Sequence, residues 1–433
     1  MWGYLPVSWT FRKRIVRFVR SSLWLVPALA ALGAFLSTPF LRLLDKTLNL
    51  TLLHFSSEGA RGVGAVVSAA MLSFLVFFFS VLLLTVQIAS STLSPRIISR
   101  PFRYRTLKVS IALFVLTLIY SMALVARGME GNVGQLTTAI VLILTLISIC
   151  SFLYVVEFVS KQLRPITVME NVASDGIKVI HDVYPEVFSE STTEQWLATD
   201  SNFHPPTRII VHRRRPGVVL AIDVDTLVEL AGRHACMIEI VPEVGDFVAT
   251  GDPVFRIYGG GAEIADKKLL ERIVLDQERT LEQDPAFAFR IIVDIASKAL
   301  SPAINDPTTA VIALDQIHHL LREVGMRRLD TGLVYDEAGQ LRLAYHTPDW
   351  EDFVGLAVTE IRQFGVNSTQ VARRMRAMLE NLIEVLPPSR CVILRKELEL
   401  LKATVERGFP VLEDKRRAES ADFQGLGGRR KAS

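Results

Sequence analysis

Four long uncharged stretches dominate the first third of the chain, and short charged segments separate them. The stretches cover residues 21–41, 62–95, 109–126 and 131–156. A helix needs about 20 apolar residues to cross the hydrocarbon core of a bilayer, and only a helix satisfies its own backbone hydrogen bonds there within one segment. The pattern therefore predicts four transmembrane helices, near residues 22–42, 64–90, 107–127 and 134–158.

The first stretch has a second interpretation, a cleaved signal peptide. That interpretation requires a shorter apolar stretch and small residues at a cleavage site. Here the stretch is long, and the bulky segment 41–44 (Leu-Arg-Leu-Leu) follows it. The sequence favours an uncleaved transmembrane helix.

Basic residues gather in two of the segments that flank the predicted helices. Residues 1–20 hold five basic residues and no acidic one. The loop after the second helix carries Arg96, Arg100, Arg103, Arg105 and Lys108, again without an acidic residue. By the positive-inside rule, both termini and all of residues 165–433 are expected in the cytoplasm. The four arginines of this loop are candidates for contact with lipid headgroups.

Polar residues recur every seven positions along the second predicted helix, at Ser73, Ser80, Gln87 and Ser94. Seven residues are about two helical turns, so these side chains form one stripe. The stripe has two interpretations: a seam at which helices pack closely and hydrogen-bond, which we favour, or the lining of a water-filled pore in an oligomer. The uncharged stretches hold no Asp, Glu, Lys, Arg or His, which argues against carriage driven by ions or protons.

The charge balance reverses after residue 164. Residues 1–164 carry 16 basic and 4 acidic residues, whereas residues 165–433 carry 32 basic and 41 acidic residues. We expect a four-helix transmembrane domain over 1–164, an amphipathic helical linker over 165–206, a small β-rich module over 207–261, a helical domain over 262–417 and a disordered tail over 418–433. The predicted fold class is an α-helical membrane protein with an α+β cytoplasmic half.

The β-rich module has alternating apolar residues between tight glycine turns, which is typical of strands. Residues 243–257 resemble the closing hairpin of biotinyl/lipoyl-type domains, so we expect a small β-barrel-like module. Those domains carry a modifiable lysine, and residues 208–257 contain none, so no covalent cofactor is expected. The basic run 212–215 is interpreted as solvated or paired with acidic helices, with docking on anionic lipid headgroups as the alternative.

A short polar segment interrupts the helical pattern at residues 301–310. Asp306 can cap a new helix with Pro307 at its first position, and a corner between two helices accounts for every residue of the segment. The alternative is an anion or ligand site made by the helix start, with Asn305, Asp306, Thr308 and Thr309 around it.

Composition excludes several classes of function. The net charge of +3 is too close to balance for a nucleic-acid-binding protein. Three widely spaced cysteines give neither a disulfide framework nor a zinc signature. No phosphate-binding loop, nucleophile elbow or zinc-protease motif is present, and His318 and His319, near Asp315, are interpreted as surface or packing residues. We expect no metal, no cofactor and no enzymatic activity.

Two segments resemble the signature of the bacterial predicted membrane proteins known as domain of unknown function 2254. One is residues 289–310, from Phe-Arg-Ile-Ile-Val-Asp to Asn-Asp-Pro-Thr-Thr-Ala, and the other is residues 90–96, Ser-Ser-Thr-Leu-Ser-Pro-Arg. The resemblance covers the chain from the first predicted helix to about residue 415. It implies a multi-pass protein of the bacterial inner membrane and implies no particular activity.

Three functional hypotheses follow. The first, which we favour, is a homo-oligomeric channel or pore for a small ion, gated by the cytoplasmic half. The second is a membrane-anchored sensor or scaffold without transport activity. The third, an enzyme that uses Asn305 and Asp306, is the weakest, because no pair of nucleophile and base is apparent. In each case the lipid bilayer is a partner and nucleic acid is not.

Overall fold

The computed structural model describes residues 22–48, 55–92, 105–129, 135–162, 164–189, 205–329 and 332–425, together with Val19 and Arg96. The described residues divide into two units, which lie within residues 14–164 and 165–433. The boundary falls after α5 (Gln135–Gln162), the last of the four apolar helices.

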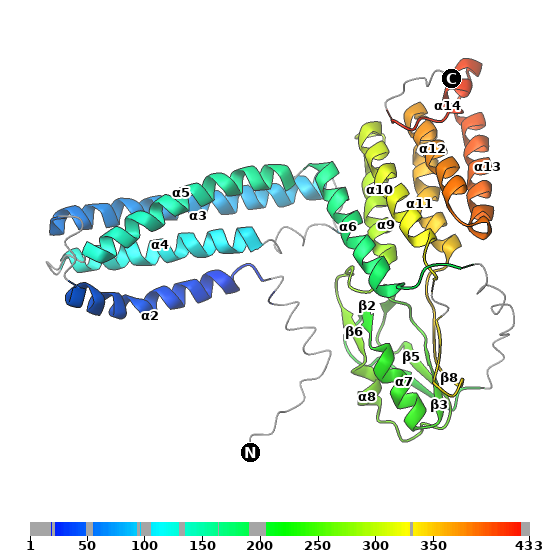
Figure 1. The fold of residues 1–433 in the computed structure, drawn as a ribbon, viewed down its shortest axis with the longest axis horizontal. Coiled ribbons are helices and arrows are strands. Elements are labelled where there is room, and N and C mark those ends of the chain that lie inside the picture. The colour runs from blue at the N-terminus through cyan, green and yellow to red at the C-terminus, as the bar shows by residue number, and fades with distance from the viewer. Residues whose placement is uncertain are drawn as a thin grey trace. The chain divides into compact units, whose positions relative to one another are not determined.

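Four apolar helices form the first unit, as the hydrophobic pattern predicts (Figure 1). They are α2 (Leu25–Leu48), α3 (Ser57–Thr92), α4 (Arg105–Met129) and α5 (Gln135–Gln162). All four are long and apolar enough to cross a membrane. Each continues past the C-terminal end of its predicted span, because helical hydrogen bonding extends into the polar residues that flank an apolar stretch.

Helix α4 packs against each of the other three helices. It contributes fully buried side chains such as Phe114 and Leu124. Helices approach closely in a membrane where small residues meet, and a Cβ atom added to Gly64 of α3 would lie 2.9 Å from the carbonyl oxygen of Ser121 in α4. Between α3 and α5 the rings of Phe74 and Phe152 stack with their centroids 4.7 Å apart. Close packing therefore holds the four helices together as one bundle.

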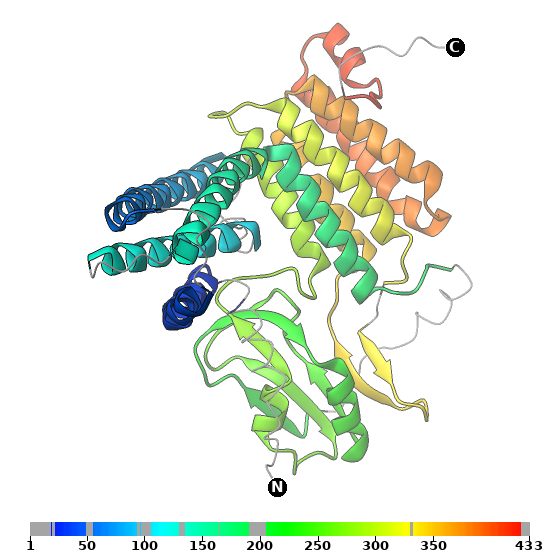
Figure 2. The same cartoon turned by 60° about the vertical axis from the view of Figure 1, so that its left-hand side comes forward.

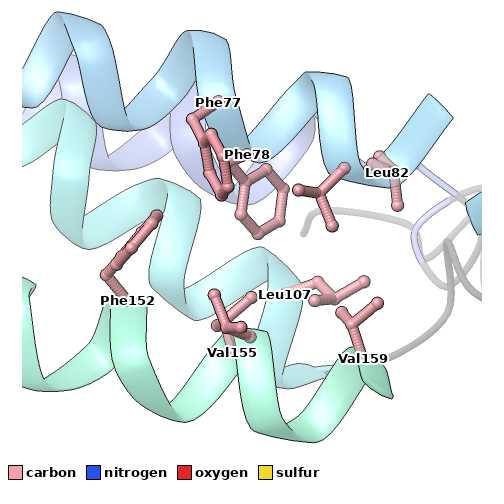
Figure 3. Close-up of a pocket in the computed structure, with 9 residues that line it drawn as sticks. Phe77, Phe78, Leu82, Leu107, Phe152, Val155 and Val159 are labelled. Carbon is pink, nitrogen blue, oxygen red and sulfur yellow. The ribbon is translucent and has the colours of Figure 1, made fainter. Parts of the chain in front are cut away.

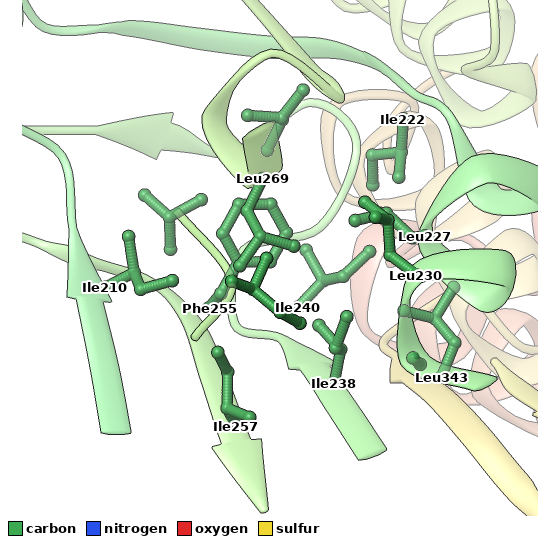
Figure 4. Packing of buried hydrophobic residues seen from close by; sticks show 14 of the residues in the cluster. Ile210, Ile222, Leu227, Leu230, Ile238, Ile240, Phe255, Ile257, Leu269 and Leu343 are labelled. Carbon is green, nitrogen blue, oxygen red and sulfur yellow. The ribbon is translucent and has the colours of Figure 1, made fainter. Parts of the chain in front are cut away.

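The β-rich part of the second unit contains two sheets. The first has the strand order β1 (Arg208–Val211), β5 (Pro253–Gly259), β3 (Cys236–Ile240), β8 (Leu341–Tyr345) and β7 (Leu333–Tyr335). The second has the order β4 (Phe247–Val248), β2 (Gly217–Ile222) and β6 (Ile273–Asp276). Two short helices, α7 (Val224–Arg233) and α8 (Asp266–Leu270), complete this part. Figure 4 shows its core, where Phe255 and Ile240 lie among Leu227, Leu230 and Leu269.

The expected β-barrel-like module is not found, because both sheets are open among the residues that the structure describes. The segment that resembles a lipoyl-type hairpin is not a hairpin either: β4 pairs with β2, whereas β5 pairs with β1 and β3. Strands β6, β7 and β8 lie within residues 262–417, where the sequence predicts helices. Alternation of apolar residues identifies a strand face but not its partner, and β8 pairs in parallel with the distant β3.

The helical part of the second unit is a bundle. It comprises α6 (Pro165–Val183), α9 (Pro285–Ala299), α10 (Pro307–Gly325), α11 (Trp350–Phe364), α12 (Thr369–Val385), η4 (Pro388–Arg390), α13 (Cys391–Gly408) and α14 (Leu412–Ala418). Helix α6, which the sequence analysis assigns to a linker, packs against α9 and α10 (Figure 2). A Cβ atom added to Gly176 of α6 would lie 2.6 Å from the Cβ of Ala288. This contact makes α6 part of the bundle.

The first part of the expected disordered tail, as far as residue 425, packs against α12. Arg373 donates a hydrogen bond to the carbonyl oxygen of Ser420 (2.9 Å), and Gln370 donates one to that of Gly425 (2.7 Å). Asp422 is buried and accepts hydrogen bonds from the backbone N–H groups of Gln424 and Gly425. These contacts order the segment after α14.

Candidate functional site

The polar stripe of the second apolar helix lies on the outward face of the four-helix bundle. Ser73, Ser80 and Gln87 are all exposed on α3, and Ser94 lies outside the described residues. The hydroxyl of Ser73 donates to the carbonyl oxygen of Ala69 (3.0 Å), and that of Ser80 donates to the carbonyl oxygen of Val76 (2.9 Å). The two serines therefore satisfy their hydroxyl groups within their own helix, while Gln87 presents an amide outward.

Other polar residues make the hydrogen bonds between helices inside the bundle. The hydroxyl pairs are Ser37 with Tyr120 (2.7 Å), Ser68 with Ser121 (2.7 Å), Thr117 with Ser148 (3.1 Å) and Ser110 with Ser151 (2.8 Å). Each pair joins α4 to one of its neighbours. The stripe on α3 is thus not a packing seam within a single chain.

Small residues accompany the stripe on the same face of α3. Ala65 and Ala69 are exposed and precede Ser73 at intervals of four residues. A Cβ atom added to Gly62 would have nothing within 4 Å. Small residues at this spacing are the pattern with which membrane helices approach one another closely. The outward face of α3, defined here by Gly62, Ala65, Ala69, Ser73, Ser80 and Gln87, thus combines small side chains with polar groups.

A wholly apolar pocket lies on another side of α3, where this helix meets α4 and α5 (Figure 3). Its wall is formed by Phe77, Phe78, Val81, Leu82, Leu107, Phe152, Val155, Val156 and Val159. In Figure 3, Phe77 and Phe78 of α3 lie opposite Phe152 and Val155 of α5. With no polar group in its wall, the pocket offers nothing to orient a polar ligand.

The arginines expected at lipid headgroups are only partly described. Arg96 and Arg105 are both exposed, and Arg100 and Arg103 lie outside the described residues. Lys108, one turn into α4, is instead buried and donates a hydrogen bond to the carbonyl oxygen of Val19 (3.1 Å). Lys108 therefore belongs to the packing of the bundle.

One polar contact of the bundle carries no signal in the sequence. The carboxylate of Asp45, near the end of α2, accepts hydrogen bonds from the backbone N–H of Leu136 (2.9 Å) and the hydroxyl of Thr137 (2.6 Å). A carboxylate stabilises the positive end of a helix dipole, and Asp45 occupies that position at the start of α5. Asp45 is too far in sequence from Leu136 and Thr137 for spacing to reveal the contact.

The 301–310 segment forms a corner between α9 and α10. Asn305 has a positive φ of 49°, and Asp306 caps α10 by accepting hydrogen bonds from the backbone N–H and the hydroxyl of Thr309 (3.1 and 2.5 Å). Thr308 is exposed beside them. The carboxylate of Asp306 already occupies the position that an added anion would take, and the corner accounts for each of these contacts.

Replacing Asp306 with alanine is expected to destabilise the start of α10 by about 1 kcal/mol, because the cap is lost, whereas Asp306→Asn keeps most of the stability. Hydrogen exchange at the first-turn amides of α10 measures both effects. Slower exchange at Thr308 and Thr309 upon addition of inorganic phosphate to the wild type would instead support the anion site.

His318 lies in a hydrogen-bonded network between α10 and α12. Its Nδ1 atom is 3.2 Å from the guanidinium of Arg374, and its Nε2 atom is 2.9 Å from the side-chain oxygen of Asn381. Arginine can only donate, so Nδ1 accepts and Nε2 carries the proton. Burial and the charge of Arg374 lower the pKa of His318, which keeps the ring neutral. Both ring nitrogens are therefore used in packing, as the sequence analysis favours for this residue.

A second charged network joins α9 to α11. The guanidinium of Arg290 donates two hydrogen bonds to the carboxylate of Glu360 (2.5 and 2.7 Å) and a third to that of Asp294 (2.7 Å). These bonds raise the pKa of Arg290 further above its usual range. Asp294 is thus occupied by an ion pair on its own helix. In the part of the chain that the structure describes, no group of three His, Cys, Asp or Glu residues could hold a metal ion.

Comparison with known proteins places the chain among membrane proteins that have no assigned activity. A family model described as "Predicted membrane protein (DUF2254)" matches residues 20–381. Uncharacterized protein Rv1290c of Mycobacterium tuberculosis (strain H37Rv) and uncharacterized protein Mb1321c of Mycobacterium bovis are each 27% identical over 417 residues, which is 92% of this chain and 79% of the relative. No solved structure matches. The family match runs from before α2 into α12, so the chain belongs to the DUF2254 family of predicted membrane proteins.

Proposed function

We propose that the chain forms a homo-oligomeric channel for a small ion in the bacterial cytoplasmic membrane. In this proposal both termini and the second unit lie in the cytoplasm, where the second unit gates the channel. The observation that carries the proposal is the outward face of α3, on which polar and small side chains lie exposed although the bundle supplies its own hydrogen bonds elsewhere.

Gln87 is the residue of this face that is most costly to expose to lipid. Its side-chain amide has two donors and an accepting oxygen, and a lipid tail can pair with none of them. Transfer of an unpaired amide from water into hydrocarbon costs up to about 4–8 kcal/mol. The cost falls towards the edge of the core, but a serine that bonds to its own helix avoids most of it at any depth. A second copy of the chain or a water-filled path relieves this cost.

The length of α3 suggests where each polar group would lie. The helix has 36 residues and is roughly 54 Å long, whereas the hydrocarbon core is about 30 Å thick. A core centred on the uncharged stretch 62–95 would hold Ser73 and Ser80 at depth and Gln87 near the cytoplasmic edge. Gln87 would then stand at the inner mouth of a pore, close to the basic loop that contains Arg96 and Arg105. Such a mouth favours anions over cations.

Disulfide trapping tests whether α3 faces a second copy. Ser80→Cys in a Cys150→Ser background is expected to form disulfide-linked dimers in the membrane, since the other two cysteines, Cys236 and Cys391, are buried. The matched control is Leu146→Cys, which is also exposed but lies on α5. Equal cross-linking at both positions, or cross-linking at Leu146→Cys alone, would contradict an α3 interface.

Flux measurements separate the channel from the alternative, a membrane-anchored sensor or scaffold. The size and acidic charge of the second unit favour the sensor or scaffold, since a simple gate needs neither so large nor so acidic a domain. Purified protein in liposomes is expected to pass chloride more readily than potassium. If trapping at Ser80→Cys succeeds and neither ion passes under any gradient, the oligomer is a scaffold and the constitutive channel is wrong.

A further inference from the structure

An arginine-rich turn projects from the β-rich part of the second unit. It follows β1 and consists of Arg213, Arg214 and Arg215, all exposed. Among the described residues, no hydrogen bond or ion pair is made by any of the three guanidinium groups. The neighbouring arginines differ, because Arg208 pairs with Asp266 and Arg256 pairs with Glu239. The interpretation that the run 212–215 is paired with acidic helices therefore does not apply to these side chains.

The backbone of the arginine turn is held firmly in place. His212 is buried, and its Nε2 atom donates a hydrogen bond to the carbonyl oxygen of Arg215 (2.8 Å). Its backbone N–H donates to the carbonyl oxygen of Asp252 (2.8 Å), and its own carbonyl oxygen accepts from Gly251 (2.7 Å). The hydroxyl of Thr250 donates to the carbonyl oxygen of Arg214 (2.8 Å). A turn fixed in this way presents its arginines to solvent without further ordering of the backbone.

Two acidic residues of the adjoining turns face their own loops. Asp252 accepts a hydrogen bond from the backbone N–H of Ala249 (2.8 Å), and Asp246 accepts one from that of Glu243 (2.9 Å). Each carboxylate thus closes a tight turn and makes no ion pair with the arginine turn among the described residues. The guanidinium groups remain available to an external anion.

An exposed aromatic residue lies beside the arginine turn. Phe247 is 66% exposed at the start of β4. It is paired across the second sheet with Val218, and the following residue Val248 is paired with Gly217, so the phenylalanine lies one strand away from the residues that directly follow the turn. An exposed aromatic ring next to a basic cluster is the combination that peripheral membrane surfaces use, because the ring enters the headgroup boundary while the cations bind anionic lipids.

The chain is already tethered to a membrane. Only residues 163 and 164 separate α5, the last apolar helix, from α6, so the second unit is confined near the lipid surface. A tether converts docking into an intramolecular step, for which weak contacts suffice. Residues 165–433 carry 32 basic and 41 acidic residues, and an anionic membrane repels this net negative charge. The arginine turn, whose guanidinium groups are unpaired among the described residues, therefore determines which face of the second unit contacts the lipid.

We propose that the arginine turn, together with Phe247, docks the β-rich part of the second unit on anionic lipid headgroups of the membrane that the four helices cross. The contact would consist of guanidinium–phosphate pairs at Arg213, Arg214 and Arg215 and insertion of the Phe247 ring at the headgroup level. This contact does not depend on the channel proposal.

Hydrogen exchange of the full chain in nanodiscs tests the docking surface. One set of discs contains phosphatidylcholine alone, and the other contains equal parts of phosphatidylcholine and phosphatidylglycerol. Amides of residues 211–217 and 246–251 are expected to exchange more slowly in the anionic discs and to lose that protection in high salt. Each arginine is expected to make one salt-sensitive contact with an anionic headgroup. Replacement of all three by glutamine is therefore expected to weaken docking roughly a hundredfold.

Matched variants make the outcome decisive. Phe247→Ser is expected to lower the protection against exchange without abolishing its salt dependence. Replacement of Lys415, Arg416 and Arg417 of α14 by glutamine is expected to leave the protection unchanged. Equal exchange in both lipids would overturn the proposal, as would protection that survives in the triple arginine variant. Equal protection by a short oligonucleotide in detergent would also overturn it, in favour of a site for soluble polyanions. Exchange in neutral discs shows whether each variant is folded.

Discussion

Replacing Gln87 with leucine is expected to reduce ion flux through the reconstituted protein by about tenfold or more. A leucine at the inner mouth of a pore removes a group that hydrates a passing ion, and an apolar constriction closes a pore by dewetting. A loss of about 1.4 kcal/mol at this position corresponds to a factor of ten. Chloride and potassium flux into liposomes, measured separately for both proteins at equal protein content, gives the result.

The matched control for this experiment is Thr85→Val. Thr85 lies on the same helix and is also polar, but it is buried in the bundle and donates its hydroxyl to the carbonyl oxygen of Val81 (2.8 Å). Its replacement is expected to leave flux unchanged. If Gln87→Leu leaves flux at the wild-type level, the outward face of α3 does not line the path. If it changes only the oligomeric state, the face is a seam between copies.

Replacing Phe353 with alanine is expected to lower the free energy of unfolding of the second unit by about 3–5 kcal/mol. Phe353 is fully buried in α11. Its ring contacts those of Phe289 in α9 and Tyr184 after α6, with centroid distances of 5.4 and 6.4 Å. The variant loses the burial of a large ring and two aromatic contacts, and it leaves a cavity among three segments.

Hydrogen exchange in the full chain measures this effect, because the slowest amides of α9 and α11 exchange through global unfolding of the unit. The control is Phe364→Ala on the same helix, where the ring is 52% exposed and little stability is expected to be lost. A loss below 1 kcal/mol for Phe353→Ala would mean that the core relaxes to fill the space. It would also mean that α6 does not depend on this aromatic cluster.

The aromatic cluster also anchors the segment that follows α6. Helix α6 follows α5 after two residues, and Tyr184, which follows α6, is anchored against Phe353. The segment beyond it is bound as well: Phe188 packs against the guanidinium of Arg390 at 4.6 Å, and the N–H of Arg328 donates to the carbonyl oxygen of Glu186 (2.9 Å). The segment after α6 is therefore fixed to the helical bundle of the second unit.

Several features follow from the sequence alone because their causes are local. A hydrocarbon core accepts only long uncharged helices, so the four stretches without charge determine the four apolar helices. The corner at 301–310 is equally local: Asp306 caps the helix that Pro307 begins, and both capping hydrogen bonds reach only three residues along the chain. Residues 289–310 also carry the family resemblance that the comparison confirms.

The tertiary structure alone decides which surfaces meet. Ser68 and Ser73 lie on the same helix in equally apolar surroundings, yet Ser68 bonds to Ser121 of α4 and Ser73 faces outward. Hydropathy assigns the two serines the same value, and only the packing of α4 distinguishes them. The open sheets are decided in the same way, since the short alternating segment of β8 becomes a strand by pairing with the distant β3.

The pairing of the arginines is likewise decided by the tertiary structure. The sequence does not tell which arginines are paired: Arg290 finds Glu360 on another helix, whereas Arg213–Arg215 find no carboxylate among the described residues. Capping, helix length and turn chemistry act over a few residues, so the order of amino acids is sufficient to determine them. Ion pairing, strand partners and the outward direction of a helix face depend on contacts between distant segments, and these exist only once the chain has folded.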